Sequence, residues 1–148
     1  MDKANIPKVL IIAGSDSSGG AGVQADIKTC AAFGVYTSTA ITAITAQNTV
    51  GVQDIMNVPA KLVREQIKSV LSDVGADVIK IGMLGDSSII EAVAEEIEDS
   101  NAFIILDPVM VASTGSVLLE KGSIDCLKSK LLPLADSVSY THLTLPTN

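Results

Sequence analysis

The stretch Ala13–Thr29, with the sequence AGSDSSGGAGVQADIKT, decides the fold of this 148-residue chain. The apolar run Val9–Ala13 leads into it and is typical of a buried strand. A glycine-rich turn follows, after which Val23, Ile27 and Ala31 recur at helical spacing. The order of strand, turn and helix indicates an α/β protein, in which loops at the carboxyl ends of strands border the ligand-binding crevice.

The glycine-rich turn has two interpretations. Glycine lets the backbone approach a ligand closely, and the free amides at a helix N-terminus attract anions, so a phosphate site is one of them. The spacing matches neither G-x-G-x-x-G nor G-x-x-x-x-G-K-[ST], and Asp16 and Asp26 would repel an anion. The other is a tight strand-to-helix turn capped by Ser17 or Ser18. The turn alone leaves both open.

Composition limits the classes of partner. Hydrophobic residues make up 47% of the chain and aromatic residues 3%, which suits an aliphatic core around a parallel sheet. A net charge of −7 argues against nucleic acid or an anionic membrane surface as the main partner. Cys30 and Cys126 lie far apart, so no zinc pattern is present. The sequence has no apolar stretch of membrane-spanning length, and we expect a cytoplasmic protein.

Strand and helix patterns alternate along the whole chain. This alternation predicts βαβ units and a mostly parallel sheet within a single domain. The expected strands cover residues 9–13, 36–46, 78–84 and 103–106, with a short extended segment at 55–58. The first expected helix covers residues 20–33, with Gly34 just beyond its end. A second begins at Pro59, and a third begins after a cap at Asp86 or Ser87. A fourth includes Ile124, Leu127 and Leu131.

Polar or unusual residues follow each of the four expected strands. Because the carboxyl ends of parallel strands lie along one edge of a sheet, we expect these groups to converge in space. A few polar groups among apolar ones are what a small-molecule pocket needs. The residues at these strand ends are Gly14, Ser15 and Asp16, then Gln47 and Asn48, then Gly82 and Met83, and finally Asp107.

Several of these side chains also have a purely structural interpretation. Asp26 lies early in its helix, where its carboxylate could interact favourably with the helix dipole, or it could accept a hydrogen bond from a ligand. Gln47 could close a strand end or read an aminopyrimidine edge, because its amide offers both a donor and an acceptor. Core packing is favoured over ligand contact for Met83. Asp107 could be a turn residue or a Mg²⁺ ligand. Lys80 is expected to extend along the margin of the sheet into solvent.

Four motifs in a fixed order carry a family resemblance: AGSDSSGGAGVQADIKT, ITAITAQNT, KIGML and DPVMVASTG. Together they resemble the hydroxymethylpyrimidine/phosphomethylpyrimidine kinases of thiamine biosynthesis, which are ribokinase-like, and in part the related pyridoxal kinases. The resemblance spans about residues 9–138. It implies a three-layer αβα fold that is incomplete at the C-terminus, and a homodimer for the full-length form.

The resemblance also implies the reaction and the site. The activity would be ATP- and Mg²⁺-dependent phosphorylation of the hydroxymethyl group of 4-amino-5-hydroxymethyl-2-methylpyrimidine, and then of its monophosphate. Gln47 would pair with the amino and nitrogen edge of the ring, Met83 and Val109 would pack against its faces, and Asp107 would lie toward the phosphates and the metal. Thr45 takes a pocket position that is often aliphatic in the family. The residues expected to bind the pyrimidine are Gly14, Asp26, Gln47, Met83 and Val109.

Two departures from the family pattern concern the later part of the chain. The family's catalytic base is an aspartate in a G-T-G-C type loop, which this sequence lacks together with most of the ATP-binding region. No catalytic residue is therefore expected here, and residues 1–138 are interpreted as a partial kinase domain, inactive alone, that carries the substrate side. Residues 139–148 do not align with the family and are interpreted as a tail that is either artefactual, the favoured origin, or a real divergence, so His142 is not expected to be catalytic. A pyridoxal kinase and a non-catalytic pyrimidine-binding fragment are the alternatives.

Overall fold

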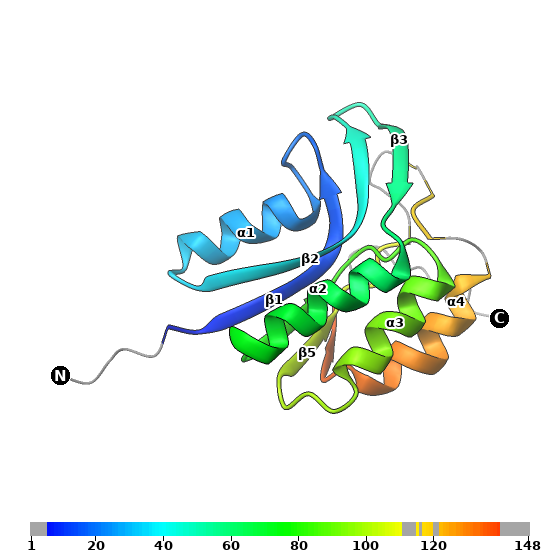
Figure 1. Cartoon of the computed structure of the whole chain (residues 1–148). Coiled ribbons are helices and arrows are strands. Elements are labelled where there is room, and N and C mark those ends of the chain that lie inside the picture. Colours follow the sequence, from blue (N-terminus) through cyan, green and yellow to red (C-terminus); the bar gives the residue numbers. More distant parts are fainter. Residues whose placement is uncertain (1–5, 111–114, 116, 120–121, 140–148) are drawn as a thin grey trace.

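Six strands form one sheet in the computed structural model of the chain, which describes residues 6–110, 115, 117–119 and 122–139 (Figure 1). The strand order is β3-β2-β1-β4-β5-β6. Every neighbouring pair is parallel except β2 and β3, which are antiparallel. The strands are β1 (Lys8–Asp16), β2 (Tyr36–Gln47), β3 (Val52–Asn57), β4 (Val78–Ile81), β5 (Phe103–Leu106) and β6 (Ser137–Val138).

Helices lie on both faces of this sheet and complete three layers (Figure 1). The chain passes from β1 to β2 through α1 on one face, then returns through α2 to the far side of β1, and α3 and α4 follow α2 on the second face. No helix within the described residues is long and apolar enough to cross a membrane. The helices are α1 (Gly22–Ala32), α2 (Ala60–Asp73), α3 (Ser87–Ile97) and α4 (Ser123–Cys126), the last continuing as a π-helical turn (Leu127–Leu131) and a 3₁₀ turn (Leu132–Leu134).

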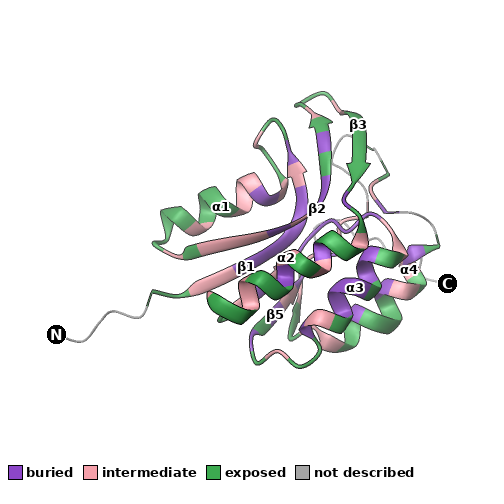
Figure 2. Cartoon of the chain, viewed as in Figure 1, coloured by how far each residue is buried: buried purple, intermediate pink, exposed green. Residues whose placement is uncertain are grey.

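β1 is buried along most of its length and supplies apolar side chains to both faces of the sheet (Figure 2). Leu10 and Ile12 point toward α2 and α3 and belong to the larger hydrophobic cluster. Ile11 and Ala13 point the other way, where they meet Val23 of α1 in a smaller cluster. Because successive residues of a strand face opposite sides, one apolar run supplies both clusters.

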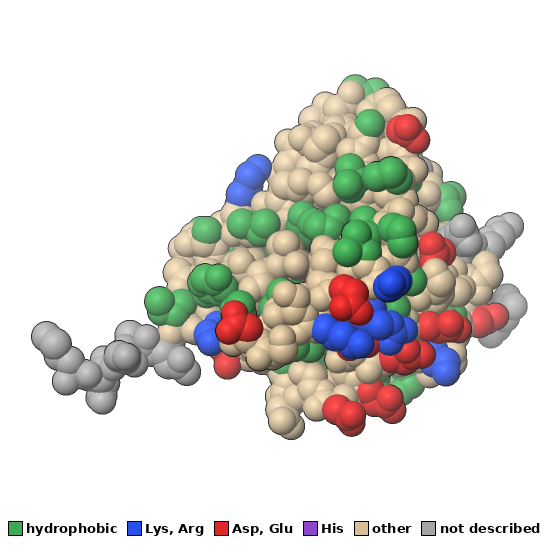
Figure 3. Space-filling view, viewed as in Figure 1, with side chains coloured by type: hydrophobic (Ala, Val, Ile, Leu, Met, Phe, Trp, Pro, Cys, Tyr) green, Lys and Arg blue, Asp and Glu red, His purple; other side chains and the backbone are tan. Residues whose placement is uncertain are grey.

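Charged side chains of both signs gather on the surface formed by α2 and α3 (Figure 3). The guanidinium of Arg64 on α2 pairs with Glu95 at 2.6 Å and with Glu96 at 2.8 Å, both on α3. The Glu95 side chain is exposed and those of Arg64 and Glu96 are partly buried, and ion pairs near the protein surface contribute little to stability. The apolar residues beneath them hold the two helices to the sheet.

The helix starts test the predicted caps. Asp86 caps α3 as predicted, since its Oδ1 accepts from the amide of Ile89 at 3.0 Å. The predicted Ser17 or Ser18 cap of α1 is wrong, because Ala21 occupies the N-cap position and its own side chain makes no capping bond. Gly34, expected beyond the end of this helix, has a φ of +69°.

Some element boundaries differ from prediction. β1 continues through the polar residues Ser15 and Asp16, because both still pair with β2 after a register shift between Ala13 and Ser15. β4 ends at Ile81 instead of Leu84. The amide of Gly82 still bonds to the carbonyl of Ile12, and the chain then turns away toward α3. β6 was not predicted, because two residues show no periodicity.

Candidate functional site

The sheet has its topological switch point between β1 and β4. The chain leaves β1 toward α1 on one face and leaves β4 toward α3 on the other, so the strand ends open a crevice between them. A pocket of about 280 Å³ lies there, formed by the ends of β1, β2, β4 and β5 and the start of α1. All six residues that the sequence singled out for binding line it, namely Gly14, Asp26, Gln47, Met83, Asp107 and Val109.

The carboxylate of Asp16 organises the glycine-rich turn from within. It is 3% exposed and accepts from the amides of Gly20 at 3.0 Å and of Ala21 and Ser18 at 2.8 Å, and the Ser18 hydroxyl also donates to it. Burial alone would raise the pKa of Asp16, but these hydrogen bonds outweigh it and lower the pKa below its usual 3.8. Three backbone amides of the turn are thus occupied by the chain itself and are not available to a phosphate. These bonds support the tight-turn interpretation, although the carboxylate of Asp16 holds the turn together and no serine caps the helix.

Close packing places Gly14 and Met83 against each other at the pocket floor. A Cβ at Gly14 would lie 2.8 Å from Met83 Sδ, so a larger residue there would require the Met83 side chain to shift. Met83 is 8% exposed, and its carbonyl accepts from the buried Thr42 hydroxyl at 2.7 Å. Core packing, the interpretation favoured for Met83, and contact with the pocket therefore both apply.

Gln47 is held at the pocket by bonds to the glycine-rich turn. The Ser17 hydroxyl accepts from the backbone amide of Gln47 and donates to its backbone carbonyl, each at 2.8 Å. The Thr45 hydroxyl donates to the carbonyl of Ser15 at 2.8 Å and to Gln47 Oε1 at 3.3 Å. Within the described chain, Gln47 Nε2 makes no hydrogen bond and is free to donate to a ligand.

Lys80 contradicts the prediction that it extends along a sheet margin. It lies in β4, in register with Ile11 of β1 and Ile105 of β5. Its Nζ donates to Asp26 Oδ2 at 2.7 Å and lies 3.9 Å from Asp107 Oδ2. Sequence reasoning missed Lys80 as a site residue, although a lysine inside the apolar run of β4 was the available signal.

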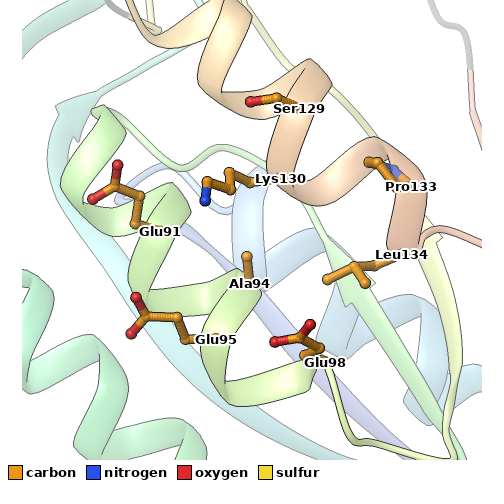
Figure 4. A pocket seen from close by; sticks show the side chains of 8 residues that line it. All are labelled: Glu91, Ala94, Glu95, Glu98, Ser129, Lys130, Pro133 and Leu134. Atoms are coloured by element: carbon orange, nitrogen blue, oxygen red, sulfur yellow. The ribbon is translucent and has the colours of Figure 1, made fainter.

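A larger hollow of about 490 Å³ lies elsewhere, between α3 and the segment that follows α4 (Figure 4). Its wall on α3 carries Glu91, Glu95 and Glu98, and Lys130 extends from the opposite side. It lies away from the strand ends and contains none of the motif residues. The described residues contain no group of three or more His, Cys, Asp or Glu that could hold a metal ion by itself.

Asp107 fits the role of a single carboxylate beside a phosphate-bound cation. It directly follows β5 and its side chain is 24% exposed, so it is open to the pocket. Mg²⁺ is usually held by one or two carboxylates together with waters and substrate phosphates. The DPVMVASTG motif continues into residues 111–114, which lie outside the described part of the chain.

A mostly parallel sheet between two helical layers, with a pocket at its switch point, defines a doubly wound α/β protein. A family model described as phosphomethylpyrimidine kinase matches residues 16–139, and the chain belongs to this family. The family and the three-layer ribokinase-like fold expected from the motifs are confirmed.

Individual relatives agree with this assignment. The chain is 49% identical over 137 residues to the hydroxymethylpyrimidine/phosphomethylpyrimidine kinase of Haemophilus influenzae, covering 92% of this chain and 51% of that protein. The crystal structure of phosphomethylpyrimidine kinase from Clostridium difficile superposes with a TM-score of 0.82 and 42% identity, over 90% of this chain and 58% of that one. The structure of the pyridoxal kinase from Staphylococcus aureus in complex with pyridoxal superposes with a TM-score of 0.79 and 39% identity, over 90% of this chain and 49% of that one. The chain thus spans about half the length of these relatives.

Proposed function

We propose that the whole protein transfers a phosphoryl group from ATP to the hydroxymethyl group of 4-amino-5-hydroxymethyl-2-methylpyrimidine, and then to the resulting monophosphate. The observation that carries this proposal is that the predicted pyrimidine-binding residues all line one pocket, of about 280 Å³. Membership of the phosphomethylpyrimidine kinase family supports it.

The proposed role of this chain is to bind the acceptor. Gln47 offers a free donor to the ring nitrogens, and its Oε1 can accept from the ring amino group. Asp26 Oδ1 makes no hydrogen bond within the described residues, whereas Oδ2 is taken by Lys80, so Oδ1 can accept from a ligand. Met83 and Val109 give apolar walls to a flat ring, and the missing Cβ of Gly14 leaves room for the Met83 side chain in that wall.

Phosphoryl transfer depends mainly on positioning and charge neutralisation, with a base near the attacking hydroxyl. Asp107 would help to hold Mg²⁺, which supplies the charge neutralisation at the phosphates when it is bound. The 148 residues contain no G-T-G-C sequence. We therefore assign the acceptor side of the site to this chain and expect no turnover from it alone.

Calorimetric titration of the chain with the hydroxymethylpyrimidine tests the binding role. We expect the wild type to bind, and Gln47→Ala to weaken affinity by about tenfold because paired hydrogen bonds are lost. Gln53→Ala is the matched control, since Gln53 lies on β3 outside the pocket and its side chain bonds, among the described residues, only to Asn48 and Gly51. A folded wild type without affinity, or equal losses in both variants, would contradict the proposal.

An assay of the chain with ATP, Mg²⁺ and the same pyrimidine tests the assignment of the base. We expect no phosphorylated product, and clear turnover from these 148 residues would overturn the statement that the base lies elsewhere. The same assay on a longer form of the protein, if it yields the monophosphate and diphosphate, would support the full activity.

Pyridoxal phosphorylation is the second candidate. The likeness to the Staphylococcus aureus pyridoxal kinase in complex with pyridoxal favours it, at 39% identity. Titration of pyridoxal and the hydroxymethylpyrimidine into the same chain separates the two, and we expect the pyrimidine to bind more tightly. Binding without phosphorylation by any longer form would instead indicate a non-catalytic pyrimidine-binding protein.

A further inference from the structure

Lys80 stands in an unusual place for a charged side chain. β4 lies between β1 and β5, and Lys80 is flanked along its strand by Ile79 and Ile81, which are buried in the larger cluster. Strand alternation therefore directs Lys80 to the opposite face, the one that carries α1. A cation at this depth destabilises the fold unless it is paired, so its partners are informative.

Both partners of Lys80 are carboxylates of the pocket. Asp26 comes from α1 and Asp107 from the end of β5, so one ammonium joins three elements. The three side chains are 23–25% exposed, and all three line the pocket. The bond to Asp26 uses Oδ2 only, which orients the second carboxylate oxygen without consuming it.

The chain also keeps space open beside this ammonium. A Cβ at Gly82 would lie 3.3 Å from Lys80 Nζ and 3.0 Å from the Cβ of Ala13, so a larger residue would crowd the lysine. Meanwhile α1 is already fixed to β1 by other contacts, since Gln24 Oε1 accepts from the Asp16 amide at 2.9 Å. The lysine is therefore not needed simply to attach the helix.

We propose that Lys80 is a positioning residue of the acceptor site. Its ammonium holds Asp26 so that Oδ1 faces the ligand, and it offsets the charge of Asp107 on the neighbouring strand. This inference deepens the proposed function and rests on it. Without the lysine, two carboxylates would share the pocket with no cation between them, and Asp26 would lose its fixed orientation.

Calorimetry with 4-amino-5-hydroxymethyl-2-methylpyrimidine tests this role on four forms of the chain. We expect Lys80→Met to weaken binding by about tenfold or more, the effect of losing a hydrogen bond to a charged group. Lys80→Arg, which keeps the charge and donors, should retain clearly tighter binding than Lys80→Met. Lys61→Met removes the same charge from the exposed surface of α2 and should bind like the wild type.

A double-mutant cycle separates positioning from simple attachment. If Lys80 acts through Asp26, then Lys80→Met combined with Asp26→Asn should bind no more weakly than Asp26→Asn alone. Losses that multiply would overturn the proposal. Circular dichroism melts accompany each titration, because a merely structural tether predicts a lower Tm with unchanged affinity. If Lys80→Met alone does not fold, the comparison of the double variant with Asp26→Asn still decides.

The wild-type titration separates the two proposals. A folded wild type with no affinity for the pyrimidine contradicts both the proposed function and the role of Lys80. Equal affinity of the wild type and Lys80→Met contradicts the role of Lys80 alone. So does a Lys80→Arg variant that binds no better than Lys80→Met.

Discussion

The two faces of the sheet are packed to different degrees, although the same strands supply both. On one face, α2, α3 and α4 cover the sheet, and the described residues form a cluster of 20 buried apolar side chains. On the other face, the cluster beneath α1 has three buried members within the same described residues. The first face accounts for most of the hydrophobic stabilisation, at about 1.5–3 kcal/mol for each large side chain fully buried.

This difference teaches where a site can be built. α1 packs on β1 and β2, so on its face the ends of β4 and β5 are left for polar groups. Lys80 and Asp107 occupy these strands, and Asp26 reaches them from α1. Partly exposed ion pairs are tolerated there, whereas on the well-covered face they would displace the core.

Neighbouring residues of β5 provide the largest expected effect. Ile104 is 5% exposed within the larger cluster, whereas Ile105 lies on the face of Lys80 and is only half-buried. We expect Ile104→Ala to lower the free energy of unfolding by about 3 kcal/mol, because it leaves a cavity in a close-packed region. Ile105→Ala should lower it by about 1 kcal/mol. Urea unfolding measures both, and equal losses would show that the two faces are equally packed.

Asp16 gives the next largest effect, on the α1 face. We expect Asp16→Asn to lower the free energy of unfolding by about 2 kcal/mol at pH 7, since bonds from three amides to a carboxylate are weakened. The pKa of Asp16 is lowered in the folded state, so its stabilisation is present above the unfolded pKa of 3.8 and is lost as pH falls further.

The stability of wild type and Asp16→Asn should therefore converge below about pH 4. Urea midpoints across pH 3 to 7 measure this. A difference that does not change with pH would show that the carboxylate is not ionised in the bonds described.

Asp86 is the counterpart of Asp16 on the covered face, where it caps α3. Burial raises its pKa, but bonds from the Ser88 hydroxyl, the Ile89 amide and Asn57 lower it below its usual value overall. We expect Asp86→Ala to destabilise the fold by about 1 kcal/mol, the usual effect of a lost N-cap. Asp99→Ala, an exposed change beyond the same helix, should stay within about 0.5 kcal/mol. Thermal melts compare the two variants, and equal shifts in Tm would show that the N-cap bond of Asp86 does not stabilise the fold.

The sequence predicts much of the architecture, because the fold depends on patterns that are local. Alternation of apolar runs and helical spacing located β1, β2, β5 and the first three helices to within a few residues. Convergence of the strand ends also followed from sequence, since parallel strands place their carboxyl ends along one edge. This is why Gly14, Gln47 and Asp107 line one pocket as expected.

What the sequence could not supply are contacts between distant segments. The bond from Lys80 to Asp26 joins residues 54 positions apart, and the Ser17–Gln47 pair joins residues 30 apart. Propensity places Lys80 in a strand but says nothing of which strands flank it. The role of Asp16 in the turn was not predicted for a related reason, because its carboxylate accepts from amides four and five residues ahead in a turn without a regular cap pattern.

Ser17 carries the smallest expected change in stability and the sharpest contrast between stability and binding. Its hydroxyl makes two bonds to the backbone of Gln47 at an exposed position, so Ser17→Ala should cost about 0.5–1 kcal/mol of unfolding free energy. Pyrimidine affinity should fall several-fold, about as much as one neutral hydrogen bond contributes, because Gln47 is no longer fixed to the glycine-rich turn.

Ser72→Ala on α2, which removes a hydroxyl bonded only to a local carbonyl, should change neither quantity appreciably. Calorimetry and urea unfolding on these two variants decide the point. Unchanged affinity in Ser17→Ala would mean that the strand pairing of β2 is enough to position Gln47. The α1 face would then be more rigid at the site than its small hydrophobic cluster suggests.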